Sequence, residues 1–198
     1  MRVLQIGGSR QGVGKTSLGC ALIGALPQYE WMALKISPHG HGGGDRGGLS
    51  EESRAAKDRA DNGKDTSRYL AAGARRAWLV EGEVPESFWR ARELDDGLLV
   101  VESNGRLGWG VAPCAFLAVA DDGPDTWKAS FAARWREADA LVLSGVAAGA
   151  AWAEEGFAGE IFRLAAGRWV ADSLVDMVAR KLGFEPSAEG RFRGPAGR

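Results

Sequence analysis

The sequence has no long apolar run, no excess of charge of one sign and few cysteines. No segment approaches the roughly 20 consecutive apolar residues of a membrane-spanning helix, so we expect no membrane association. Lys and Arg number 25 and Asp and Glu number 26, which argues against the basic field that general nucleic-acid binders need. Cys20 and Cys114 stand alone in apolar segments, which predicts buried thiols in a reducing compartment.

The remaining composition is that of an ordinary globular protein. The chain has 198 residues, of which 45% are hydrophobic and 26% charged, a size that suits one domain. Its first residues meet polar side chains and glycine too early for a signal peptide, so we expect a cytoplasmic protein. We assign residues 1–184 to a single domain and residues 185–198, which are rich in Gly, Pro and Arg, to a flexible tail.

Short apolar runs alternate with helix-like segments along the chain. Such runs, when nearly continuous, are typical of buried parallel strands covered by helices. We therefore predict an α/β fold with three layers and a mostly parallel central sheet of about seven strands. Residues 37–63 are rich in glycine and predict a mobile loop, with a short helix near residues 51–59. The predicted strands cover residues 3–7, 31–37, 75–80, 97–102, 114–120, 140–144 and 160–164.

The clearest motif is a glycine-rich loop followed by Gly-Lys-Thr, between the first strand and a helix over residues 15–26. Glycines let backbone N–H groups surround an anion, and the helix N-terminus adds partial positive charge. Lys15 can reach the β- and γ-phosphates, and the Thr16 hydroxyl can bind Mg²⁺. The loop is one residue longer than the standard pattern, since Ser9 stands where the first Gly is expected. The predicted nucleotide contacts are Gly8, Arg10, Gln11, Gly12, Val13, Gly14, Lys15, Thr16 and Ser17.

Three further charged residues are expected beside this loop. Glu102 ends the most apolar strand, which puts it at the carboxyl edge of the sheet where ligands of α/β proteins bind. We assign it to the metal, with capping of the strand as the alternative. Lys35 ends the second strand and either faces the γ-phosphate or extends into solvent. Asp65 either caps the helix over residues 66–72 or supplies a second carboxylate for Mg²⁺.

His39, His41, Arg10 and the eight tryptophans allow more than one interpretation. The two histidines either contact substrate or phosphate or lie in solvent; two nitrogens are too few for a closed zinc site. Arg10 either touches a phosphate, across a dimer interface in one arrangement, or is solvated beside the anion site. The tryptophans are expected mainly in the core, with some at a pocket or a partner surface as the alternative.

Several known families share parts of this pattern. The longer loop resembles those of dethiobiotin synthetase and the cobyrinic acid amide synthases, and Arg10 stands at the signature lysine position of MinD and ParA loops. The order of loop, Lys35 with the histidine stretch, Asp65-Thr66-Ser67-Arg68 and Glu102 resembles the small MobB-like P-loop proteins of molybdopterin-guanine dinucleotide biosynthesis. This resemblance covers roughly residues 2–105. It implies that Lys15 and Thr16 bind nucleotide and that Asp65 and Glu102 lie on the metal side.

The resemblance implies a Mg²⁺-dependent P-loop NTPase with Lys15, Lys35 and Glu102 as the catalytic set. The expected ligands are ATP or GTP, because the segment after residue 144 has no Asn-Lys-x-Asp motif that would select guanine. A MobB-like accessory factor, working as a homodimer with an enzyme of cofactor biosynthesis, is the first functional hypothesis. A dethiobiotin synthetase-like ligase and a MinD-like dimerising switch are the alternatives.

Overall fold

The fold is taken from a computed structural model of the whole chain. It describes residues 1–37, 48–53, 65–92, 97–121, 123–145, 151–165, 167–186 and 192–193. His39 and His41 lie outside the described residues, so their predicted roles stay predictions. The same holds for most of the helix predicted near residues 51–59.

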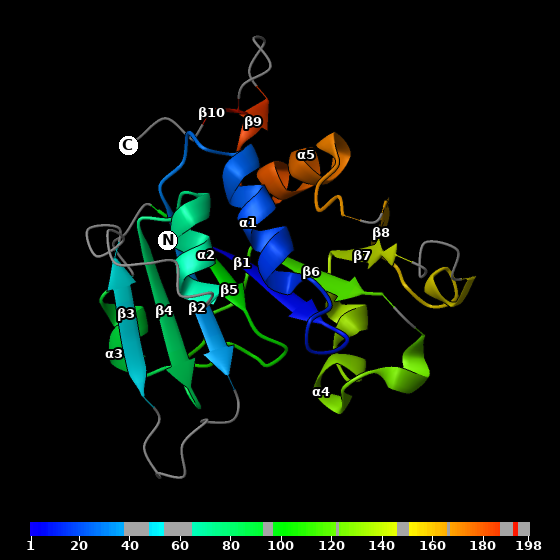
Figure 1. The fold of residues 1–198 in the computed structure, drawn as a ribbon, viewed down its shortest axis with the longest axis horizontal. Helices are drawn as coiled ribbons and strands as arrows, with labels where there is room; N and C mark the ends of the chain where they lie inside the picture. Colours follow the sequence, from blue (N-terminus) through cyan, green and yellow to red (C-terminus); the bar gives the residue numbers. More distant parts are fainter. Residues whose placement is uncertain are drawn as a thin grey trace.

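An eight-stranded sheet forms the centre of the molecule, in the order β3-β4-β2-β5-β1-β6-β7-β8 (Figure 1). Every neighbouring pair is parallel except β3 and β4. The central strands are mostly apolar, with Gln5 and Lys35 as polar exceptions, as expected for a sheet covered on both faces. The strands are β1 (Arg2–Gly8), β2 (Trp31–Ser37), β3 (Leu49–Ser53), β4 (Arg76–Glu81), β5 (Leu98–Glu102), β6 (Ala115–Ala120), β7 (Ala140–Ser144) and β8 (Glu160–Leu164).

All seven predicted strands are present, and the eighth corrects the predicted count. This strand, β3, lies inside the segment that we assigned to a glycine-rich loop, and it occupies residues 51–53, where a helix was predicted to begin. Its sequence, Leu-Ser-Glu-Glu-Ser, has one apolar residue. Among the described strands, β3 lies at the edge of the sheet and pairs with β4 alone. Polar edge strands carry little hydrophobic signal.

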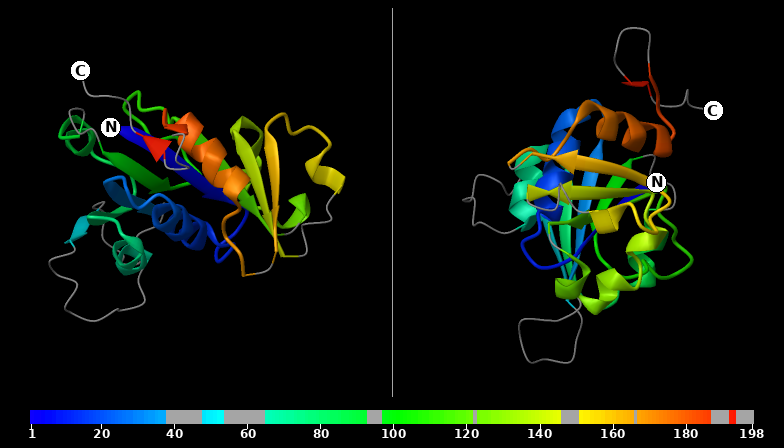
Figure 2. Two further views of the ribbon diagram at one scale, coloured as in Figure 1. Left: turned by 90° about the horizontal axis from the view of Figure 1, so that it is seen from above. Right: turned by 90° about the vertical axis from the view of Figure 1, so that its right-hand side faces the viewer.

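Helices cover both faces, so the predicted three layers are confirmed. The helices α1 (Lys15–Ala25), α2 (Asp65–Ala72) and α5 (Asp172–Lys181) share one apolar cluster on one face. The helices α3 (Glu86–Arg90) and α4 (Ala129–Ala132) pack on the other face. Figure 1 shows α1 and α2 next to each other in front of the sheet, and Figure 2 shows α5 running beside the sheet in two further views.

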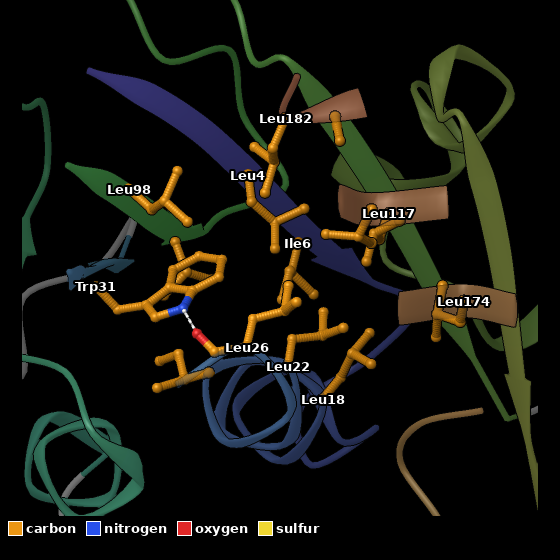
Figure 3. Close-up of a cluster of buried hydrophobic side chains, with 14 of the residues drawn as sticks. Leu4, Ile6, Leu18, Leu22, Leu26, Trp31, Leu98, Leu117, Leu174 and Leu182 are labelled. Carbon is orange, nitrogen blue, oxygen red and sulfur yellow. Dashed lines mark hydrogen bonds between the residues drawn. The ribbon is translucent and has the colours of Figure 1, made fainter. Parts of the chain in front are cut away.

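The largest cluster joins α1 to the central strand (Figure 3). Leu18, Leu22 and Leu26 recur every four residues and pack toward Leu4 and Ile6 of β1, and all five are at most 1% exposed. Each buried leucine contributes about 1.5–3 kcal/mol. This packing fixes the start of α1 against the end of β1, which is where the glycine-rich loop lies.

Most tryptophans lie in or against the core, as predicted. Four of them are buried, namely Trp31, Trp78, Trp89 and Trp135. The indole N–H of Trp31 donates to the Leu26 carbonyl at 3.0 Å (Figure 3). Trp109 is the departure, because 57% of it is exposed.

The cysteine prediction is wrong for Cys114, which is exposed. Its backbone N–H bonds to the Val3 carbonyl, yet the residue precedes β6 and lies outside the buried strand. Cys20, in α1, is partly buried, and burial raises the pKa of its thiol to about 11. Residues 185–198, predicted as a tail, contain two short antiparallel segments, β9 (Glu185–Pro186) and β10 (Phe192–Arg193).

Within the described residues, none of the helices has the length and apolar character to cross a membrane.

Candidate nucleotide-binding site

The glycine-rich loop, residues 7–16, connects β1 to α1 as predicted. Gly14 precedes the helix with a φ of 105°, a conformation that favours glycine. The loop is tied to its surroundings at Ser9, whose N–H donates to the Val119 carbonyl at 2.9 Å and whose carbonyl accepts from Lys128 N–H at 2.8 Å. The N-terminal turn of α1 therefore presents its free N–H groups at the carboxyl edge of the sheet.

Gly8 lies at a tight point of the loop. A Cβ at this position would lie 2.5 Å from Val13 Cγ1 and 2.7 Å from Lys15 Cγ, distances that no side chain tolerates. The Asn104 side chain holds the same residue from outside, since its Oδ1 accepts from Gly8 N–H at 2.7 Å and its Nδ2 donates to the Gly8 carbonyl at 3.1 Å. Glycine at position 8 therefore fits an approach that a larger residue would block.

Glu102 lies next to the loop, at the end of β5. The sheet register pairs it with Ile6 of β1 and with Lys35 of β2. The Thr16 hydroxyl donates to Glu102 Oε2 at 2.7 Å. The other carboxylate oxygen, Oε1, lies 3.6 Å from Lys35 Nζ and 3.9 Å from Lys15 Nζ. Four of the predicted site residues therefore meet at one carboxylate, which is only 5% exposed.

Asp65 completes the group from the first residue of α2. It forms an ion pair with Lys35, and Arg68 Nη1 lies 3.6 Å from its Oδ1. Arg68 also donates to the Ser17 hydroxyl at 2.9 Å, so the Asp-Thr-Ser-Arg segment contacts both β2 and α1. Asp65 is the first residue of α2 and lies in the charged cluster, and its predicted roles as a helix cap or a Mg²⁺ ligand stay predictions.

The charged groups shift one another's pKa values. Burial lowers the pKa of Lys15, and the positive charges of Lys35 and Lys128 lower it further, against the attraction of Glu102. Burial opposes protonation of Lys35, but Glu102 and Asp65 outweigh it and raise the pKa of that amine. Burial would raise the pKa of Asp65, but its hydrogen bond and ion pair with Lys35 lower it.

The oxygen ligands present suit Mg²⁺. This ion takes one or two carboxylate or hydroxyl oxygens from a protein and completes its shell with water and phosphate. Thr16 Oγ1 and the Glu102 carboxylate are such oxygens and are already adjacent. Asp65 is connected to them through Lys35, which pairs with both carboxylates. Across the described segments no group of three or more His, Cys, Asp and Glu side chains is arranged to hold a metal ion.

Arg10 is held within its own chain. Its guanidinium forms a two-point ion pair with Asp121, with Nε donating to Oδ1 at 3.0 Å. Its backbone carbonyl accepts from Lys15 Nζ at 3.3 Å. Two other loop residues were predicted to bind nucleotide. Gln11 lines a cavity next to the charged cluster, and Val13 is buried.

Sequence reasoning missed the residues that hold the turn after β5. The buried Gln5 donates to the carbonyls of Ser103 and Gly105, at 3.0 and 2.7 Å. Arg134 donates to the carbonyls of Asn104 and Gly105, at 3.0 and 2.6 Å. A polar residue inside an apolar strand, such as Gln5, is the signal that could have revealed this arrangement. Tyr69 was also missed, and its hydroxyl donates to Glu102 Oε2 at 3.2 Å.

A cavity of about 1100 Å³ adjoins the charged cluster. Lys15, Lys35 and Glu102 form one side of it, and the exposed Trp109 lies in its wall, together with Lys128.

Two solved structures are similar to this chain at low sequence identity. HypB from Helicobacter pylori, solved in complex with nickel, has 14% identity and a TM-score of 0.57, covering 92% of this chain and 87% of HypB. A MobB homolog from Bacillus stearothermophilus has 14% identity and a TM-score of 0.44, covering 92% of this chain and 98% of that one. No protein-family model and no curated sequence matches the chain. The likeness to HypB concerns the fold alone, and with the topology it confirms that the chain has the α/β fold of the P-loop NTPases.

Proposed function

We propose that this chain is a Mg²⁺-dependent nucleoside triphosphate-binding protein that hydrolyses ATP or GTP slowly on its own. The observation that carries the proposal is the 2.7 Å hydrogen bond between Thr16 and Glu102 at the mouth of a glycine-rich loop. A hydroxyl at the start of the helix and a carboxylate at the end of a neighbouring strand are the kind of oxygen ligands that would hold Mg²⁺ beside a bound nucleotide.

Each residue of the cluster has a role in this proposal. The backbone N–H groups of the loop and Lys15 bind the phosphates, and Thr16 and Glu102 hold the Mg²⁺ ion. When bound, that ion neutralises the charge that develops on the transferred phosphoryl group. Lys35 stabilises the same charge from the side of β2, and Asp65 keeps the Lys35 ammonium in position through their ion pair. Catalysis of this type consists mainly of positioning and electrostatic stabilisation.

The cellular role that we propose is that of a MobB-like accessory factor in molybdenum cofactor biosynthesis, acting in the cytoplasm as a homodimer with an enzyme of that route. The resemblance in residues 2–105 supports it. Two separated segments that carry the resemblance, Lys35 and Asp65-Thr66-Ser67-Arg68, are joined by the Lys35–Asp65 ion pair. The Arg68–Ser17 hydrogen bond connects the second segment to α1, directly after the glycine-rich loop. An accessory factor would bind nucleotide tightly and turn it over slowly without its partner.

A ligase or kinase related to dethiobiotin synthetase is the second candidate, and the cavity beside Lys15 and Lys35 favours it. Such an enzyme would turn nucleotide over rapidly only when its second substrate is present. For the MinD-like switch, the pairing of Arg10 with Asp121 of its own chain gives no support to a contact across a dimer.

The proposal is tested by calorimetric titration of ATP and GTP, with and without Mg²⁺, into the wild-type protein and two lysine variants. Lys15→Ala is expected to abolish binding while the unfolding temperature stays within a few degrees of wild type. Lys181→Ala is the matched control, because Lys181 pairs with Asp139 on the surface and lies at the end of α5. Unchanged affinity in Lys15→Ala would exclude this site as the nucleotide site.

A further inference from the structure

The cavity beside the charged cluster is far larger than a reacting water molecule needs. Its volume is about 1100 Å³, whereas a water molecule takes about 30 Å³ of liquid. It lies at the carboxyl ends of β2 and β5 and extends past the turn that follows β4. Cavities of this size hold whole small molecules, and this one begins where Lys15 and Lys35 would meet a γ-phosphate.

Trp109 forms part of the cavity wall in an unfavourable backbone conformation. Its φ is 52°, and among the residues that the structure describes it is the sole non-glycine residue with positive φ. Gly108 and Gly110, on either side, have φ values of 78° and 71°. This conformation costs a tryptophan about 1–2 kcal/mol, a cost that proteins retain mainly where a side chain has a task at a site.

The Trp109 ring is exposed and yet held in place. The residue is 57% exposed, so burial in the core does not offset the backbone cost. Its indole N–H donates to the Val84 carbonyl at 2.9 Å, which fixes the ring against the wall. A fixed, exposed aromatic ring in a cavity is suited to stacking on a flat ring system.

Positive side chains outnumber negative ones around the cavity. Lys15, Lys35, Arg106 and Lys128 line it together with two carboxylates, Glu83 and Glu102. Glu102 is engaged by Thr16, Tyr69 and the two site lysines, and Arg106 pairs with Glu137. Lys128 lies close enough to Lys15 to repel its charge. It is therefore the cation best placed to meet an anionic group of a second ligand.

From the cavity, the held Trp109 ring and this excess of positive charge, we infer that the protein binds a second substrate here, a small organic anion with a flat ring system. Its anionic group lies toward Lys128 and the γ-phosphate position, and its ring stacks on Trp109. The inference deepens the proposed function and rests on it, because this ligand can be a second substrate only if a nucleotide binds beside the cavity.

Three probe molecules separate the two parts of this recognition. Titration calorimetry with 2-naphthoate, 2-naphthylmethanol and acetate tests a ring with charge, a ring without charge and a charge without a ring. We expect 2-naphthoate to bind at least tenfold more tightly than either of the others. Absence of 2-naphthoate binding, or equal binding of the alcohol, overturns the inference.

Variants of the chain locate the probe. Trp109→Gly should weaken 2-naphthoate binding at least tenfold while leaving the unfolding temperature nearly unchanged, because glycine adopts the positive φ without strain. Lys128→Gln should weaken 2-naphthoate at least fivefold and leave 2-naphthylmethanol unaffected. Leu49→Ala, at the other exposed large apolar residue, should change neither. Wild-type affinity for 2-naphthoate in both cavity variants would place the probe elsewhere and refute the site.

Nucleotide titrations on the same preparations keep the two proposals apart. Binding of ATP or GTP without 2-naphthoate binding refutes the cavity and leaves the nucleotide site intact. Binding of 2-naphthoate without nucleotide binding refutes the proposed function, and with it the assignment of the ligand as a second substrate.

Discussion

Thr16 and Glu102 are 86 residues apart in sequence and share a buried 2.7 Å hydrogen bond, with the Thr16 hydroxyl donating to Glu102 Oε2. The bond spans from the first turn of α1 to the last residue of β5. Both side chains are at most 7% exposed. This bond aligns a hydroxyl and a carboxylate beside the phosphate loop.

Glu102→Gln should weaken the response to Mg²⁺. The amide keeps the shape of the side chain but removes the charge that orients the metal, so we expect half-saturation of NTP hydrolysis to need about 10- to 100-fold more Mg²⁺. The measurement is hydrolysis rate against Mg²⁺ concentration. Thr16→Ser, which retains the hydroxyl, is the control and should stay close to wild type. An unaltered Mg²⁺ curve in Glu102→Gln would remove Glu102 from the metal site.

Asn104→Ala should loosen the phosphate loop. The change deletes both hydrogen bonds to Gly8, and we expect it to lower the free energy of unfolding by about 1–3 kcal/mol. Nucleotide affinity should fall about tenfold, since the loop N–H groups lose their support. Urea unfolding and calorimetry measure the two effects. Ser130→Ala, which removes a single 3.3 Å contact to Asn104, should have little effect, and nucleotide affinity equal to wild type in Asn104→Ala would contradict the prediction.

Gly14→Ala should destabilise the protein for two separable reasons. The φ of 105° strains any other residue, and the new Cβ would lie 1.9 Å from Cη2 of the Trp169 ring. Adding Trp169→Ala to Gly14→Ala removes the clash but not the strain, so the double variant should recover part of the lost unfolding temperature. If thermal unfolding of the double variant shows simple addition of the two single losses, the contact is not the cause.

The two cysteines should react with alkylating reagents at very different rates. Cys114 is exposed, whereas burial raises the pKa of Cys20 to about 11, and the thiolate is the reactive species. At pH 8 we expect iodoacetamide to modify Cys114 at least tenfold faster, as followed by intact-mass and peptide mass spectrometry. In Cys114→Ser the rapid phase should vanish. A rapid phase that persists in this variant would place the reactive thiol at Cys20.

Asp65 should make stability depend on pH. Its pKa in the folded protein is lowered by Lys35, so the carboxylate stabilises the fold above its ordinary pKa of about 3.9. This contribution is lost as the pH falls through the depressed folded value. Asp65→Asn should therefore be less stable than wild type at pH 7, and the difference should shrink below about pH 4. Urea unfolding between pH 7 and pH 2.5 measures it; a constant difference would assign the loss to packing.

The sequence predicts the buried part of this fold because strands such as β5, β6 and β7 are continuous apolar runs. The edge strand β3 was missed because Leu49 is its one apolar residue. Cys114 was misplaced because its apolar neighbours belong to β6 while the residue itself precedes that strand. Local patterns do not state where a buried strand begins.

The site was predictable where position along a strand decides the location. Glu102 and Lys35 end neighbouring parallel strands and therefore meet in register, and Lys15 and Thr16 follow from the loop motif. Gln5 carried a signal, as a polar residue in an apolar strand, but Asn104 and Arg134 were not predictable, because their roles depend on contacts between residues 29 to 96 positions apart. No local sequence pattern indicates that the Asn104 side-chain amide forms hydrogen bonds with the backbone of a loop far away in the sequence.

The fastening of the loop at Ser9 and Gly8 has a thermodynamic consequence. The Val119 carbonyl and Asn104 Oδ1 accept from the backbone N–H groups of Ser9 and Gly8, and Lys128 N–H donates to the Ser9 carbonyl. The chain therefore loses conformational entropy at these two residues during folding. Ordering a flexible loop is a substantial part of the cost of many association reactions. Because Gly8 and Ser9 are already ordered, this part of the loop adds little to the entropy cost of binding an anion.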